Sequence, residues 1–258
     1  MTHTTPYTDY GTQFAEIYDD LFPREHITDA DTSWLAEHIP PGSPHILELG
    51  VGTGRVALPL WETLTRRGDT PMFVGIDISR EMLNQLATKD PHAHIDRRQG
   101  DIAHEDLGSN GYDTILCLCA TISMLTDHTA QQDTFRAAAK ALKPGGHLIV
   151  ETHNSALIQA LNPSGAGAYA VPYPGGQRML VTFSELNGNQ WTVNHCWINN
   201  GVATFGNESS SVTTLAELDT YATEAGLTPV THTSGLSGNP LQDHDATVCA
   251  TYIKPHNS

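Results

Sequence analysis

The stretch ILELGVGTGR, residues 46–55, constrains the fold more than any other part of the sequence. An apolar run ends at Leu49, a glycine-rich turn follows at once, and residues 55–67 have the pattern of a helix. A strand, a glycine turn and a helix form the first unit of an open parallel sheet, in which ligands bind beside the carboxyl ends of the strands. The sequence therefore predicts an α/β fold with a ligand site at this turn.

The spacing of the glycines distinguishes between ligands. Gly50, Gly52 and Gly54 form the pattern G-x-G-x-G, whereas a dinucleotide fingerprint, G-x-G-x-x-G, would need glycine in place of Arg55. No Gly-Lys-Ser/Thr follows, so the phosphate-loop pattern is also missing. Glu48 puts a carboxylate just before the first glycine, where a pyrophosphate would lie. This favours a cation or a hydroxyl-rich group over a phosphate bridge.

The sequence E-x-G-x-G-x-G from Glu48 to Gly54 resembles the first motif of the class I S-adenosylmethionine-dependent methyltransferases. The resemblance extends over residues 14–253 and is strongest in four segments: 46–55, 72–82, 99–102 and 141–151. It implies a doubly wound, seven-stranded, mostly parallel sheet of Rossmann-like type. It also implies S-adenosyl-L-methionine as cofactor and S-adenosyl-L-homocysteine as product.

The cofactor site implied by this resemblance draws on several strand ends. The second strand, 72–77, ends at Asp77, where an acidic residue accepts hydrogen bonds from ribose hydroxyls. In the family, an acid at the position of Asp101 takes the adenine amino group and its neighbour packs the ring. The end of the fourth strand would lie beside the methionine portion. The expected cofactor residues are Tyr18, Glu48, Gly50, Gly52, Gly54, Arg55, Asp77, Ile78, Met82, Asp101, Ile102, Cys117 and Leu118.

Three parts of the chain are expected. Residues 1–40 form a helical lid with a helix over 10–22, in which Tyr18 and Phe22 close over the cofactor, because aromatic faces attract a sulfonium. Residues 41–153 and 208–258 form the cofactor-binding domain. Residues 154–207 form an inserted antiparallel β cap for the acceptor, with strands over 178–185, 190–199 and 202–205. Residues 152–177 hold seven Gly or Pro residues and are expected to be a loop.

The residues that follow the fourth and fifth strands are candidates for the acceptor side. His153 is the best candidate for a base or an orienting group, because it follows a strand whose end faces the pocket. His128 and Asp127 are further catalytic candidates. Asp243-His244-Asp245 contains metal-ligand types but lacks two more ligands at suitable spacing, so we predict no metal site.

Composition limits the partners. The formal net charge is −16, and 13 Lys and Arg residues spread along the chain supply no basic face for a nucleic acid. Four cysteines form no C-x-x-C pair, which indicates buried thiols in a reducing compartment. The N-terminus lacks the pattern of a signal peptide, and no apolar run is long enough to span a bilayer. We expect a cytoplasmic protein with a small-molecule acceptor, without nucleic-acid or membrane partners.

The Tyr18-Asp19-x-x-Phe22 sequence together with the antiparallel insert resembles bacterial small-molecule N-methyltransferases, above all those of deoxyamino sugars in antibiotic biosynthesis. We therefore predict methyl transfer to a small molecule, at nitrogen, by in-line displacement. The alternatives are an O- or C-methyltransferase of a secondary metabolite, an NAD(P)-dependent oxidoreductase and a non-catalytic binding module. The acceptor, the number of transfers and the oligomeric state stay open, and a homodimer formed through the cap sheet is compatible with this arrangement.

Overall fold

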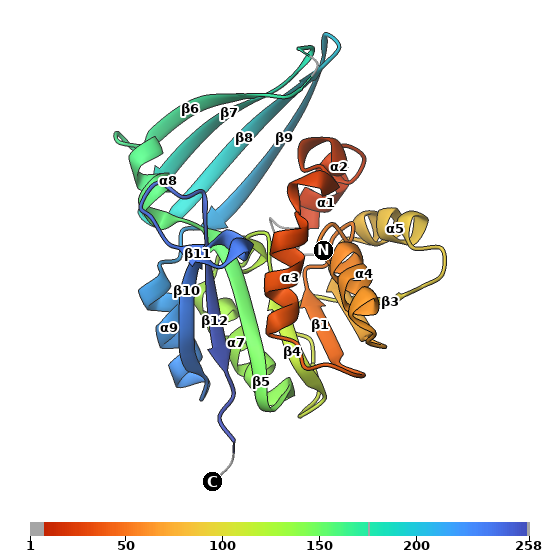
Figure 1. Cartoon of the computed structure of the whole chain (residues 1–258). Coiled ribbons are helices and arrows are strands. Elements are labelled where there is room, and N and C mark those ends of the chain that lie inside the picture. The colour runs from red at the N-terminus through yellow and green to blue at the C-terminus, as the bar shows by residue number, and fades with distance from the viewer. Residues whose placement is uncertain (1–7, 175, 257–258) are drawn as a thin grey trace, which may run out of the picture.

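The computed structural model describes residues 8–174 and 176–256, which form a helix-covered sheet and a second, smaller sheet above it (Figure 1). The order of the large sheet is β11 (Asn239–Pro240), β10 (Thr228–Ser234), β12 (Thr247–Ile253), β5 (Leu142–His153), β4 (Tyr112–Cys117), β1 (His45–Leu49), β2 (Met72–Asp77) and β3 (Ile95–Gln99). The predicted seven-stranded sheet is confirmed, and the two-residue β11 extends its edge.

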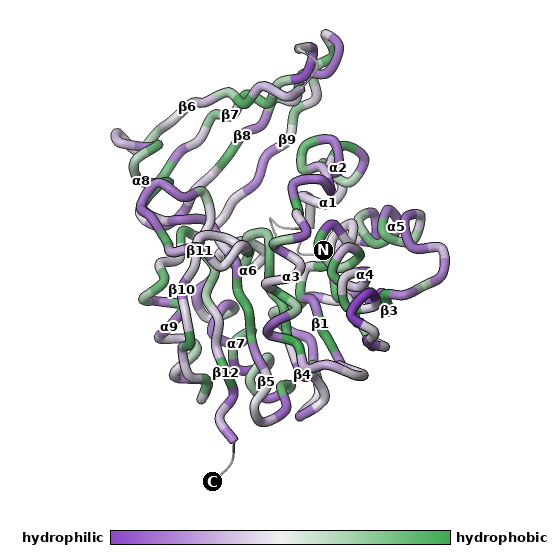
Figure 2. Tube along the Cα trace, in the orientation of Figure 1, coloured by the Kyte–Doolittle hydropathy of each residue, from purple (hydrophilic) through white to green (hydrophobic). Residues whose placement is uncertain are grey.

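The centre of the large sheet is parallel. β5, β4, β1, β2 and β3 all run in one direction, and β12 enters antiparallel between β5 and β10. Figure 2 shows hydrophobic residues along β1, β4 and β5, as expected for strands that are covered on both faces. The chain moves outward from β1 to β2 and β3, and then returns to β4 on the other side of β1. This reversal of strand order opens a crevice at the carboxyl ends of β1 and β4.

Helices cover both faces of this sheet. Because side chains alternate along a strand, Ile46 of β1 packs with one helical layer while Leu47 and Leu49 pack with the other. The first layer comprises α3 (Asp29–Glu37), α4 (Ala57–Arg67) and α5 (Arg80–Lys89). The second comprises α7 (His128–Ala141) and α9 (Leu215–Glu224). None of the described helices is long and apolar enough to cross a bilayer.

The smaller sheet is the antiparallel insert, which we call the cap sheet. Its strands, in order, are β6 (Ala166–Pro172), β7 (Arg178–Asn187), β8 (Gln190–Asn199) and β9 (Val202–Ser211). The expected loop over 152–177 is wrong, since it contains α8 (Ser155–Leu161) and β6. Asn154 caps α8 by accepting a hydrogen bond from the Ala156 N–H at 3.1 Å. β6 pairs only with β7, and an edge strand tolerates Gly167 and Pro172.

The expected single helix over 10–22 is divided in two. α1 (Thr8–Phe14) and α2 (Tyr18–Leu21) are joined by a turn, and a short 3-10 helix, η1 (Arg24–His26), follows. Phe14 and Leu21 pack with Met82 of α5 and with Leu180 and Trp197 of the cap sheet. The two helices, which we call the lid, therefore connect the cap sheet to the large sheet (Figure 1). The remaining short helices are α6 (Thr121–Met124) and η2 (Gly235–Ser237).

Candidate active site

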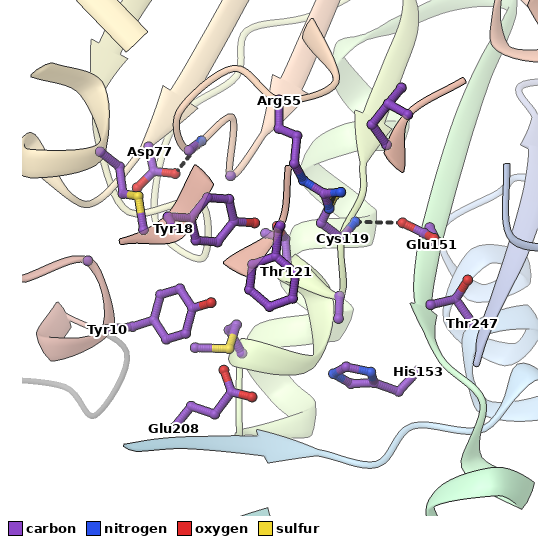
Figure 3. A pocket seen from close by; sticks show the side chains of 18 of the residues that line it. Tyr10, Tyr18, Arg55, Asp77, Cys119, Thr121, Glu151, His153, Glu208 and Thr247 are labelled. Atoms are coloured by element: carbon purple, nitrogen blue, oxygen red, sulfur yellow. Dashed lines mark hydrogen bonds between the residues drawn. The ribbon is translucent and has the colours of Figure 1, made fainter. Parts of the chain in front are cut away.

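A cavity of about 670 Å³ lies where the lid, the cap sheet and the carboxyl ends of the central strands meet (Figure 3). Tyr10 and Tyr18 reach it from the lid, Gly50 and Asp77 from the large sheet, and Glu208 from β9. Its volume is in the range of pockets that hold small molecules and cofactors. Most of its exposed lining is apolar, with polar groups at separate points on the wall.

The three glycines of the turn have different surroundings. All have positive φ, at +73° for Gly50, +54° for Gly52 and +76° for Gly54. A Cβ on Gly50 would lie 2.4 Å from the side chain of Thr121, and a Cβ on Gly54 would lie 2.4 Å from Leu86 Cδ1. A Cβ on Gly52 would meet nothing within 4 Å, although Gly52 lines the cavity. The turn therefore packs tightly on two sides and is open toward the cavity at Gly52.

Asp77 lies at the end of β2 and is held by the backbone on both sides. Its Oδ2 accepts a hydrogen bond from the Gly52 N–H at 2.8 Å, and its Oδ1 accepts one from the Ser79 N–H at 2.8 Å. Burial raises the pKa of Asp77, and these backbone donors partly offset the effect. Each carboxylate oxygen has a second acceptor site. The side chain is thus fixed in position and still able to accept hydrogen bonds from a ligand.

Arg55 brings a guanidinium group to the cavity wall. Its Nη2 donates to Cys119 Sγ at 2.9 Å, and its Cζ lies 5.7 Å from the centre of the Phe22 ring, within the range of a cation–π contact. Its Nε is buried and has no hydrogen-bond partner among the described residues. A buried N–H of a charged group without an acceptor is costly. A carboxylate in the cavity would supply that acceptor.

Glu48 lies behind this wall and is not one of the lining residues. It is 3% exposed, and its Oε2 has no hydrogen-bond partner among the described residues. Burial raises the pKa of Glu48 to about 8, despite the opposing charge of Arg55. The side chain is therefore mostly protonated at neutral pH, unless a cation bound nearby stabilises its charge.

The predicted cofactor residues divide into two groups. Glu48, Gly54, Cys117 and Leu118 lie outside the lining of the cavity, and the two residues at the end of β4 are each 1% exposed. The structure places the others on the wall: Tyr18, Gly50, Gly52, Arg55, Asp77, Ile78, Met82, Asp101 and Ile102.

The acceptor-side candidates fall in different places. His153 lines the cavity from the end of β5 and packs edge-to-face on Trp191, with ring centres 5.1 Å apart. Burial lowers the pKa of His153, and the charge of Glu208 acts in the opposite direction. His128 and Asp127 do not line the cavity, so the structure corrects the expectation that they lie at the site. Asp127 accepts a hydrogen bond from Thr129 N–H at the start of α7, as a helix cap does.

His128 has a structural role on the far side of that helix start. Its Nδ1 lies 2.5 Å from the hydroxyl of Tyr221, and its Nε2 contacts Asn189 of the β7–β8 turn. It thus connects α7, α9 and the cap sheet. Among the residues that the structure describes, no group of three or more His, Cys, Asp or Glu side chains is placed to hold a metal ion.

Sequence reasoning missed several polar wall residues, among them Tyr10, Glu151 and Glu208. Glu151 lies within β5, and its Oε2 accepts a hydrogen bond from Cys119 N–H at 2.8 Å. Glu208 was missed because the third cap strand was expected to stop at Phe205. The period-two pattern of the cap strands, continued past Phe205, would have placed Glu208 on the face opposite to it.

Comparisons with known proteins identify the family. Residues 46–146 match a family described as a methyltransferase domain. The cypemycin N-terminal methyltransferase of Streptomyces sp is 26% identical over 213 residues, which are 81% of this chain and 82% of the relative. The CcbJ methyltransferase from Streptomyces caelestis is 25% identical, with a TM-score of 0.83 over 96% of this chain and 99% of that one. Residues 46–146 are a methyltransferase domain, and the fold is that of the S-adenosylmethionine-dependent methyltransferases. The predicted family and cofactor are confirmed, in preference to an oxidoreductase.

A further structure shows the same fold. CalS10 from Micromonospora echinaspora, an amino pentose methyltransferase involved in calicheamicin biosynthesis, was solved with S-adenosylmethionine bound. It is 20% identical, with a TM-score of 0.66 over 91% of this methyltransferase and 96% of CalS10. A shorter match, to the protein YqeM of Bacillus subtilis, is 27% identical and spans 58% of the length of YqeM.

The residues on the wall fit this cofactor. The open side of Gly52 leaves room beside Asp77, whose oxygens can accept bonds from ribose hydroxyls. The unpartnered Nε of Arg55 suits the carboxylate of the methionine portion. The aromatic rings of Tyr18 and Phe22 line the same space and suit a sulfonium.

Proposed function

We propose that this methyltransferase acts on a nitrogen atom of a small-molecule acceptor. The observation that carries the proposal is the division of one cavity into two chemically different parts. Asp77, Gly52 and Arg55 suit the cofactor, whereas His153 and Glu208 reach the cavity from the end of β5 and from the cap sheet. The name of the cypemycin relative, an N-terminal methyltransferase, also supports nitrogen as the acceptor atom.

S-adenosylmethionine supplies an activated methyl group, so the protein mainly has to align the acceptor and exclude water. We assign the ribose to Asp77, the adenine amino group to Asp101 and the adenine ring to Ile102. Arg55 holds the carboxylate through its free Nε. Glu48 lies behind the glycine turn, where a bound cation would stabilise its charged form.

His153 is the candidate base. Because burial lowers the pKa of its imidazole, the ring is neutral at physiological pH and can accept a proton. Edge-to-face packing on Trp191 holds the ring in place. A neutral imidazole would also serve a phenol, so O-methylation is the alternative. The carboxylate of Glu208 on the same cavity favours an amine, whose protonated form it can bind.

We propose the following division of the chain. Residues 1–40 form the N-terminal helical part that includes the lid helices α1 and α2. Residues 41–153 and 208–258 bind the cofactor, and residues 154–207 cap the acceptor. The cap sheet itself continues to Ser211, four residues beyond that boundary. By analogy with the amino pentose methyltransferase of calicheamicin biosynthesis, we propose an aminated natural product as the acceptor.

The outer face of the cap sheet supports a homodimer. Met179, Phe183 and Phe205 lie on this face, and Phe205 is 74% exposed. A sheet face with exposed aromatic side chains is a candidate interface. Sedimentation should show a dimer that the double substitution Phe183→Ser and Phe205→Ser dissociates, and a monomeric wild-type protein would reject this part of the proposal.

The experiment that tests the activity is a mass-spectrometric search. Purified protein is incubated with S-adenosylmethionine and a panel of amines, phenols and alcohols, and products are examined for the mass of one added methyl group. We expect products from amines. Products from hydroxyl compounds alone would establish the O-methyltransferase alternative. If titration calorimetry also shows that neither the cofactor nor S-adenosylhomocysteine binds, the proposal fails at its first step.

A further inference from the structure

We propose that Glu208 selects acceptors that carry a protonated amine and that His153 receives the proton which the ammonium group gives up before methylation. The inference rests on the proposed function. It adds the charge state of the acceptor and the residue, Glu208, that recognises this charge. Both side chains line the cavity, but they come from different elements, β9 of the cap sheet and β5 of the large sheet (Figure 3).

Glu208 is a poorly exposed carboxylate without a strong partner. Its side chain is 14% exposed, and the contact that the structure shows is to His195 Nε2 at 3.4 Å. No Lys or Arg side chain pairs with it among the described residues. Removing a charge from water without a compensating partner is costly. A cation bound in the cavity would supply that partner.

His195 is held on the other side of Glu208. Its Nδ1 lies 3.1 Å from the hydroxyl of Thr182, and its ring contacts Phe14 of the lid edge-to-face at 5.7 Å. These contacts place the imidazole on the inner face of the cap sheet, where it can donate one hydrogen bond to Glu208. The other carboxylate oxygen of Glu208 stays available to the cavity.

Carboxylates outnumber Lys and Arg side chains on the described wall of this cavity. Among the described lining residues, the carboxylates belong to Asp31, Asp77, Asp101, Glu151 and Glu208, whereas Arg55 is the one Lys or Arg. Arg55 is held by Cys119 and Phe22. The proposed cofactor contacts use Asp77 and Asp101. Glu151 accepts the Cys119 N–H, and Asp31 accepts the Thr28 N–H in the capping box of α3. Glu208 is the carboxylate that the cap itself contributes, so it is assigned to the acceptor.

His153 supplies the second part of the arrangement. Its imidazole forms no hydrogen bond within the described part of the chain, although it is half-buried and its ring packs on Trp191. Both ring nitrogens of His153 are therefore available to hydrogen-bond a ligand. A half-buried neutral imidazole facing a cavity is suited to accept a proton from a bound ligand.

The proposed reaction transfers one proton and one methyl group. The acceptor enters as R–NH3⁺ and is held by the carboxylate of Glu208. One N–H bond breaks, and the proton goes to a ring nitrogen of His153. The freed lone pair on nitrogen forms the new N–C bond, while the C–S bond of the donor breaks and its electron pair stays on sulfur. The product is R–NH2–CH3⁺, which is still a cation, and His153 releases its proton to solvent.

A hydroxyl acceptor would not satisfy the same site. A hydroxyl group brings no positive charge. The carboxylate of Glu208 would then be enclosed with His195 as its one hydrogen-bond partner among the described residues. A site that hydrogen-bonds or pairs with one functional group discriminates against analogues that lack it, because its own polar group is left unpaired. The structure therefore assigns specificity for an amine to the cap sheet.

The test uses matched pairs of small ligands on the full-length protein saturated with S-adenosylhomocysteine. The pairs are benzylamine with benzyl alcohol and cyclohexylamine with cyclohexanol, and binding is measured by ligand-observed NMR. We expect each amine to bind at least tenfold more tightly than its alcohol. Glu208→Gln should remove this preference, whereas Glu208→Asp should keep most of it. Glu185→Gln, on the exposed face of the same sheet, is the matched control and should bind as the wild type does.

The outcomes separate the two proposals. S-adenosylhomocysteine binding is measured first, by calorimetry, and should be equal in the wild type and in Glu208→Gln, which also shows that the variant folds. Absence of that binding would reject the proposed function. If S-adenosylhomocysteine binds but the wild type shows no preference within the pairs, or if Glu208→Gln keeps the preference, the assignment of Glu208 is overturned and the methyltransferase proposal stands.

Discussion

Asp19 in the lid and Thr53 in the glycine turn are joined by a hydrogen bond of 2.7 Å, which Thr53 Oγ1 donates to Asp19 Oδ1. The other oxygen, Oδ2, accepts from Lys89 Nζ of α5, also at 2.7 Å. One carboxylate therefore joins the lid to the glycine turn and to α5. The adjacent residue, Tyr18, lines the cavity.

The first prediction concerns the Asp19 carboxylate. Asp19→Asn should loosen the lid and weaken S-adenosylhomocysteine binding several-fold, mainly by faster dissociation. The effect on global stability should be small, because the ion pair with Lys89 is partly exposed and such pairs contribute about 0–1 kcal/mol. Stopped-flow fluorescence measures the dissociation rate.

Asp20→Asn is the matched control for this substitution. Asp20 lies on the same short helix, and its carboxylate makes no hydrogen bond or ion pair with the described residues. It should leave the rate of dissociation unchanged. Equal rates in Asp19→Asn and in the wild type would show that the lid is held by its apolar packing alone.

Local patterns were sufficient to predict the large sheet and its ligand edge. The apolar run that ends at Leu49, the glycines and the acid at Asp77 can each be recognised from a few neighbouring residues, because a parallel strand and its following turn are locally encoded. The bounds of β2 agree with the predicted 72–77. Gly52 and Asp77 then meet because the strands pair in register.

The acceptor side could not be predicted in the same way. Glu208, His153 and Tyr10 reach one cavity from β9, β5 and the lid, and only the tertiary packing of these elements brings them together. The Gly and Pro residues of 152–177 indicated a loop and so concealed α8 and β6. An edge strand such as β6 tolerates Gly and Pro, because one of its sides has no neighbouring strand to hydrogen-bond. His128 has the chemistry of a base, but its partners Tyr221 and Asn189 hold it elsewhere.

The second prediction concerns Asp77. Asp77→Asn should weaken S-adenosylmethionine and S-adenosylhomocysteine binding by about 1–3 kcal/mol, because the amide removes an acceptor and the charge that ribose hydroxyls favour. The amide nitrogen would also face the N–H of Gly52 or Ser79. Calorimetry measures both affinities. Asp96→Asn on β3, where the carboxylate is exposed and pairs with Arg98, is the control. If Asp77→Asn binds as tightly as the control, Asp77 does not hold the ribose.

The third prediction concerns stability and pH. Burial raises the pKa of Glu48 from 4.5 to about 8, so the folded state binds a proton that the unfolded state has released between these values. The contribution of Glu48 to stability is therefore full below about pH 4.5 and is lost as the pH rises toward about 8. Glu48→Gln removes this titration. The Tm of the variant minus the Tm of the wild type should therefore increase as the pH rises.

Calorimetric scans at several pH values between about 5 and 8 test this. The comparison of the two proteins cancels the titration of groups that they share. Glu62→Gln, on the exposed surface of α4, should show no such gain. Parallel Tm curves for Glu48→Gln and the wild type would mean that Glu48 keeps an ordinary pKa in the folded protein.

The fourth prediction concerns the pH dependence of catalysis. If His153 is the base, only its neutral form is active, and the lowered pKa puts the acid limb of kcat below pH 6.5. His153→Gln should lower kcat by about 100-fold and abolish this limb, because the amide cannot take a proton. Glu208→Gln removes a charge that raises the pKa of His153, so its limb should move to lower pH. His128→Gln, a histidine outside the cavity, should leave the limb in place. A limb that persists in His153→Gln would assign the titration to another group, and the acceptor would then have to lose its proton without His153.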